Sequence, residues 1–93
     1  MSHSTEITDE ELKADILNKL LRRSCWGAKY MPKDTIVNWL AKKVKRNGKR
    51  VKKLIHELTQ NRYLLVHKKG KTISLNPTRN TEIAQYIKQG LKF

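Results

Sequence analysis

The chain has 93 residues, which allows one domain with one small core and excludes a large enclosed pocket. Its 21 lysines and arginines against eight acidic residues give a formal net charge of +13. A surplus of that size in so small a domain repels itself, so the composition indicates a polyanionic partner.

The charge is unevenly placed along the chain. Residues 1–15 hold five acids and one base, a net charge of −4, whereas the remaining residues hold 20 bases and three acids, a net charge of +17. The basic field therefore belongs to the body of the domain, and we expect the partner to be nucleic acid.

The sequence gives no sign of a membrane protein or a secreted one. No apolar run approaches the ~20 residues needed to span a bilayer, and residues 1–4 are polar, without an apolar signal region. Cys25 is the single cysteine, which excludes an intramolecular disulfide and fits a reducing compartment. We therefore expect a cytoplasmic protein that has no membrane partner.

A first helix is predicted from about Asp9 to Arg23, after a frayed lead-in over residues 1–7. Thr8 and Glu11 have the spacing of a capping box, in which the threonine side chain accepts from the backbone of the first turn. Apolar side chains then recur on one helical face: Leu12, Ile16 and Leu20.

A connector over residues 24–31, broken at Gly27, leads to a second predicted helix. Pro32 suits the first position of this helix, because an N–H is not needed there. The helical repeat of apolar residues consists of Ile36, Val37, Leu40 and Val44. The helix is predicted to run to Arg46, and Asn47-Gly48 forms a turn into the next helix.

A third helix follows this turn and is followed in turn by a β-hairpin. Its apolar face repeats at helical spacing through Val51, Leu54, Ile55 and Leu58. Residues 63–66 and 72–75 are short runs rich in β-forming residues, and Gly70 between them supplies the positive φ of a tight turn.

A last helix is predicted to start at Thr78 or Asn80 and to continue through Leu91, within residues 78–93. We expect this helix to pack on the first helix and seal the core, with packing on a second copy as the alternative. The chain is thus predicted to be one domain over residues 1–93, as a monomer or a homodimer.

This order of elements resembles a winged helix-turn-helix domain over roughly residues 8–75. The residues that carry the resemblance are Ile36–Ala41, Arg50–Leu58 and Tyr63–Val66, and Ile73–Pro77 with the terminal helix is similar to small archaeal winged-helix proteins. The resemblance implies an α+β fold with three helices, a two-stranded hairpin wing and a C-terminal helix. It also implies that the third helix enters the DNA major groove while the wing touches the backbone or the minor groove.

The candidate nucleic-acid contacts come from the basic run and from the hairpin. Positions 42–53 carry eight lysines and arginines in twelve residues, and no acid occurs between Asp34 and Glu57. Phosphates would supply the counter-charge that this run lacks. The predicted contacts are Lys43, Lys45, Arg46, Lys49, Arg50, Lys52, Lys53, His56, Lys68, Lys69 and Lys71.

The composition of this set predicts low or modest sequence specificity. Lysine is a point charge that suits phosphate better than a particular base. Arg50 is the best candidate for a bidentate contact to guanine, and His56 is either a further hydrogen-bonding contact or an exposed residue without a role.

The residues do not suggest an enzyme, a metal site or a cofactor. The acids of the basic body are far apart, the three histidines lack ligand spacing, and a phosphate-binding glycine-rich loop is absent. The favoured function is binding of duplex DNA, in transcription or in chromatin. The alternatives are an RNA- or ribosome-associated protein and a protein-interaction module.

Overall fold

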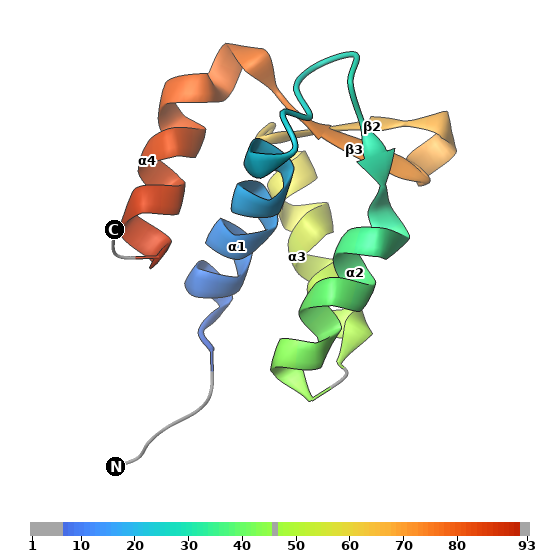
Figure 1. Ribbon diagram of the computed structural model, residues 1–93, viewed down its shortest axis with the longest axis vertical. Coiled ribbons are helices and arrows are strands. Elements are labelled where there is room, and N and C mark those ends of the chain that lie inside the picture. The colour runs from blue at the N-terminus through green and yellow to red at the C-terminus, as the bar shows by residue number, and fades with distance from the viewer. Residues whose placement is uncertain (1–6, 46, 92–93) are drawn as a thin grey trace.

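The computed structural model describes residues 7–45 and 47–91. Over these ranges the chain is an α+β fold with four α-helices and a three-stranded antiparallel sheet (Figure 1). The helices are α1 (Asp9–Arg22), α2 (Lys33–Ala41), α3 (Gly48–Gln60) and α4 (Asn80–Leu91). The strands are β1 (Met31–Pro32), β2 (Leu64–His67) and β3 (Thr72–Leu75), and the short 3-10 segments are η1 (Lys42–Val44), η2 (Lys68–Gly70) and η3 (Pro77–Arg79).

Helix α1 begins at the predicted cap. The Glu11 N–H donates to Thr8 Oγ1 over 3.1 Å, and three acids occupy the first turn, where the helix dipole favours negative charge. The helix ends at Arg22, one residue earlier than predicted, with Arg23 as its C-cap. Ile7, assigned from sequence to a frayed lead-in, is half-buried against the core, while residues 1–6 of that segment lie outside the described residues.

Strand β1 was missed by the sequence analysis, which predicted two strands and a loop over residues 24–31. Met31 pairs with Ile73 and Pro32 with Thr72, so the sheet order is β1-β3-β2. Two residues are too short a run for an alternating pattern to show, and the strand exists only because β3 lies beside it. Pro32 is therefore the N-cap of α2 and not its first residue, a correction that its edge-strand position explains.

The hairpin between β2 and β3 has an unusual turn, and β2 begins and ends one residue later than predicted. His67 pairs with Thr72, which leaves a four-residue connection from Lys68 to Lys71. Gly70 has a φ of 90°, as expected, but Lys68 and Lys69 also have positive φ values of 49° and 57°. Left-handed backbone costs a lysine roughly 1–2 kcal/mol relative to its normal conformation, so this basic turn stores backbone strain.

The core lies between the helices and the sheet, and it includes the predicted apolar face of α3. The side chains of Val51, Leu54, Ile55 and Leu58 are all at most 3% exposed. Trp26 and Trp39 are half-buried at its margin. The helical phase predicted for α3 is therefore confirmed.

Helix α4 lies along α1 in Figure 1. Ile83 and Ile87 are buried, and the two helices approach so closely at Gly90 that a Cβ there would collide with the Ala14 side chain. The Tyr86 hydroxyl donates to a Glu10 carboxylate oxygen over 2.6 Å. Burial, and then this hydrogen bond, raise the pKa of Tyr86 well above its ordinary value.

Within the described part of the chain, every helix is too short or too polar to cross a lipid bilayer.

Candidate nucleic-acid interface

Helix α3 turns one face to solvent, and that face is almost entirely basic. The Asn47 side chain caps the helix by accepting the Arg50 N–H over 3.1 Å, and this cap fixes the helical phase from its first turn. With the apolar residues buried, the opposite side of α3 is exposed, and we call its basic residues the lysine face: Lys49, Lys52, Lys53 and His56. None of the three lysines forms an ion pair with any residue that the structure describes.

Arg50 lies on a different side of α3, facing the start of α1. Its Nε donates to Asp9 Oδ1 over 2.9 Å and its Nη2 donates to the Ile7 carbonyl oxygen over 2.7 Å, while Nη2 also forms an ion pair with Asp9 Oδ1 at 2.7 Å. Two turns further on, Glu57 pairs with Lys13 of α1 over 2.9 Å. Nε and Nη2, the two nitrogens on one edge of the Arg50 guanidinium, are thus engaged within the domain.

The hairpin tip and α3 meet at one groove. The groove is lined by the tip residues Lys68–Thr72, by Lys52 of the lysine face and by residues 32–34 at the start of α2. Asp34 is the single acid among the lining residues, against five lysines. The structure therefore brings the basic hairpin tip and the basic helix α3 together, and it adds Lys33, which was not among the predicted contacts.

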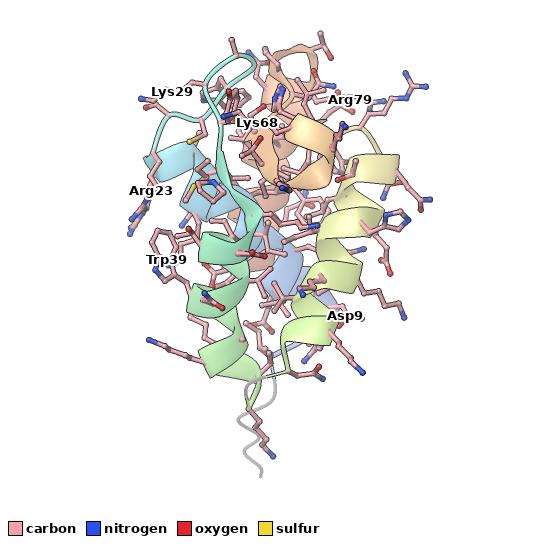
Figure 2. The ribbon with its side chains drawn as sticks, turned by 90° about the vertical axis from the view of Figure 1, so that its right-hand side faces the viewer. Asp9, Arg23, Lys29, Trp39, Lys68 and Arg79 are labelled. Carbon is pink, nitrogen blue, oxygen red and sulfur yellow. The ribbon has the colours of Figure 1, made fainter. Side chains whose placement is uncertain are left out.

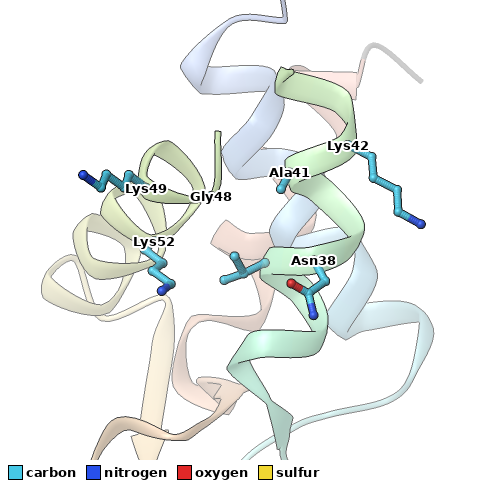
Figure 3. Close-up of a pocket in the computed structure, with 7 residues that line it drawn as sticks. Asn38, Ala41, Lys42, Gly48, Lys49 and Lys52 are labelled. Atoms are coloured by element: carbon cyan, nitrogen blue, oxygen red, sulfur yellow. The ribbon is translucent and has the colours of Figure 1, made fainter. Parts of the chain in front are cut away.

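A second groove separates α2 from α3, and Figure 3 shows its lining. In this view Asn38 of α2 and Lys52 of α3 point toward the groove, whereas Lys42 and Lys49 point away from it on opposite sides. Asn38 was not predicted as a site residue. The sequence did contain a signal for it. Asn38 follows Val37, which is buried, and one step along a helix rotates the side chain by about 100°, so Asn38 is turned out of the core.

The base of the hairpin is held by aromatic and polar contacts. The His67 ring stacks on Tyr30 at 4.7 Å between centroids, and Lys68 Nζ lies 5.2 Å from the Tyr30 ring centre. The Ser74 hydroxyl donates to the Gly27 carbonyl over 2.8 Å, so its oxygen accepts from His67 Nε2 over 3.0 Å. These contacts fix the direction in which the hairpin projects from the sheet.

The basic run over residues 42–53 does not form one surface. Lys43 turns away from α3 and pairs with the buried Asp15 of α1, whereas Lys45 is exposed after η1 with a φ of 55°. Arg46 lies outside the described residues. The structure therefore gathers two groups of predicted bases on one side of the molecule, the lysine face and the hairpin tip. Lys33, which was not predicted, lies with them.

The described residues contain no group of three or more histidine, cysteine or carboxylate side chains placed to hold a metal ion. No protein-family model, no curated protein and no solved structure matches the chain.

Proposed function

We propose that the chain is a winged-helix protein that binds duplex DNA with low or modest sequence specificity. The observation that carries this proposal is the basic groove in which Lys52 of α3 meets the hairpin-tip lysines. Duplex DNA carries one phosphate charge per ~1.7 Å of its axis, and a lysine surface without internal partners binds it by displacing condensed cations. Roles in transcription or in chromatin both follow from such binding.

The topology supports this assignment. The order α1, β1, α2, α3, β2, β3 with sheet order β1-β3-β2 is compatible with a winged helix, in which α3 is the recognition helix and the hairpin is the wing. A helix about 10–12 Å across fits the major groove, which is about 12 Å wide. With α3 in the groove, the hairpin tip reaches a flanking backbone.

Low specificity follows from the donors that this surface presents. Sequence is read best by planar, bidentate groups, and Arg50 already uses Nε and Nη2 on Asp9 and Ile7. Lysine ammonium groups fit phosphates at many orientations. The interface thus favours the shape and charge of the duplex over its base sequence.

A salt titration of duplex binding tests the proposal. If about six lysines meet phosphates, log K falls with log salt at a slope of about −5. Lys52→Gln with Lys53→Gln should make the slope shallower by about 0.9 for each phosphate that is no longer neutralised. A matched control is Arg79→Gln with Lys88→Gln, which removes the same charge near α4 and should leave the slope unchanged. A slope near zero for the parent chain contradicts the proposal.

Competition at fixed salt separates DNA from RNA. The major groove of A-form RNA is too deep and narrow for a helix, so duplex RNA should compete poorly against duplex DNA. Stronger competition by duplex or single-stranded RNA than by DNA would instead assign the surface to RNA.

A further inference from the structure

A further basic groove, distinct from the two described above, lies on the far side of α2 from the lysine face. It is lined by residues from α1 and its C-cap and from α2 and η1: Lys19, Arg22, Arg23, Trp39 and Lys43. We call it the Trp39 groove. Successive residues of an α-helix are about 100° apart, so Trp39 lies on another side of α2 than Asn38 and Ala41, which face α3. Lys43 of η1 lines the same groove as Trp39. In Figure 2, Arg23 and Trp39 stand at the edge of the molecule opposite α3 (yellow).

The Trp39 groove has an excess of positive charge that its own acid does not neutralise. Asp15 is buried and interacts with both Lys19, at 3.8 Å, and Lys43. One carboxylate thus serves two lysines, and Arg22 and Arg23 form no ion pair within the described residues. The α1 dipole offers only about half a charge at its C-terminus. The groove therefore offers net positive charge to an anionic partner.

The position of the Arg23 guanidinium suits the binding of a phosphate group. Its guanidinium carbon lies over the Trp39 ring, 4.2 Å from the ring centre, which is within the range of a cation–π interaction. Among the described residues the Arg23 side chain donates no hydrogen bond, whereas the Arg50 side chain donates two. An arginine that is stacked in place and keeps its fork of donors fits a phosphate group bidentately.

We propose that the Trp39 groove binds the phosphate backbone of a second duplex, so that one chain bridges two DNA segments. This inference rests on the proposed binding of a first duplex by the lysine face and hairpin. Because helix α2 separates the two surfaces, a straight duplex seated on the lysine face leaves the Trp39 groove open. Bridging by a monomer then needs no second copy of the chain.

A capture assay tests the proposal. One duplex is fixed to beads, a second carries a fluorophore, and the labelled duplex recovered on the beads is measured as the chain is added. Arg22→Gln with Arg23→Gln should reduce recovery about tenfold and make its salt dependence shallower by about 0.9 for each phosphate released from the groove. The affinity of this double variant for a single duplex in solution should differ from that of the parent by less than twofold. The matched control, Arg79→Gln with Lys88→Gln, should bridge like the parent.

The outcomes separate the two proposals. A parent chain that binds a single duplex but recovers no labelled duplex overturns bridging and leaves the proposed function intact. A parent that binds no duplex at all overturns both. If the double variant still bridges, the proposed role of the Trp39 groove is wrong. Bridging would then come from a dimer that presents two lysine faces. If the double variant melts early, Arg22→Gln alone, which leaves the Arg23–Trp39 stack in place, should still lower recovery at unchanged single-duplex affinity.

Discussion

The two sides of α3 both carry charged side chains but meet different surroundings. On the side facing α1, Arg50 and Glu57 each have a partner of opposite charge, at 2.7 and 2.9 Å. On the lysine face the three lysines have no acidic partner among the described residues. Helix α1 thus neutralises both charges on the side of α3 that it covers, Arg50 through Asp9 and Glu57 through Lys13, and leaves the solvent side of α3 basic.

The comparison also separates stability from binding. Exposed ion pairs contribute about 0–1 kcal/mol each, so the pairs between α1 and α3 hold the domain together only weakly. The buried apolar face of α3 supplies far more. Changes in the core or in helix packing should therefore alter the free energy of unfolding, and changes on the lysine face should alter binding.

The largest effect is expected for Leu58→Ala, beneath the lysine face. Leu58 is fully buried, and its truncation should lower the free energy of unfolding by about 2–5 kcal/mol, a large share of the roughly 5–15 kcal/mol typical of a domain. Thermal and denaturant unfolding measure the decrease. The control is Val66→Ala on the hairpin, where the side chain is 43% exposed and the cost should be small. Equal costs for the two variants would contradict the helical phase of α3.

Gly90→Ala should destabilise the domain without touching the basic surfaces. The new Cβ would collide with the Ala14 side chain, so α4 must move away from α1 at a cost of about 1–3 kcal/mol. DNA affinity, measured well below the melting temperature, should equal that of the parent. The exposed Ala84→Gly substitution on the same helix is a comparison that lowers helix propensity but creates no collision. Unchanged stability in Gly90→Ala would show that α1 and α4 pack less closely than described.

Arg50→Ala tests the partnered side of α3 directly. Removal of its bonds to Asp9 and Ile7 should cost about 0.5–1.5 kcal/mol of stability. Affinity should change by the same small factor for every duplex, since those donors are engaged within the domain. Lys53→Ala on the lysine face should show the reverse, weaker binding with nearly unchanged stability. A weaker preference at one base position in Arg50→Ala would mean that Arg50 leaves Asp9 and reads a base.

The smallest effect is expected at the hairpin tip. Lys69 has a φ of 57°, so Lys69→Gly should relieve left-handed strain and raise stability by about 0.5–1 kcal/mol. Lys71, with a φ of −84°, is the control, and Lys71→Gly should be neutral or destabilising. Both variants lack one tip charge, so their DNA affinities should fall alike. A Lys69→Gly variant less stable than Lys71→Gly would refute the strained turn.

Local chemistry in the sequence determined most of the elements. Thr8 and Glu11 cap α1, the repeat from Val51 to Leu58 sets the phase of α3, and Gly70 marks the hairpin turn, because each is a signal within a few residues. The helical phase of α3 also predicts that the lysine face is exposed, because it lies opposite the apolar face. Strand β1 had no such local signal, since its two residues are extended by their pairing with β3.

Only the tertiary structure decided which bases remain without partners. The run over residues 42–53 reads as one basic block, yet Asp9 and Asp15 of α1 take Arg50 and Lys43 out of it. The same folding places Arg23 on Trp39 and joins Lys52 to the hairpin tip across a groove. Charge pairing depends on distances of a few ångströms between residues dozens of positions apart, and only the packing of α1 against α2 and α3 sets those distances.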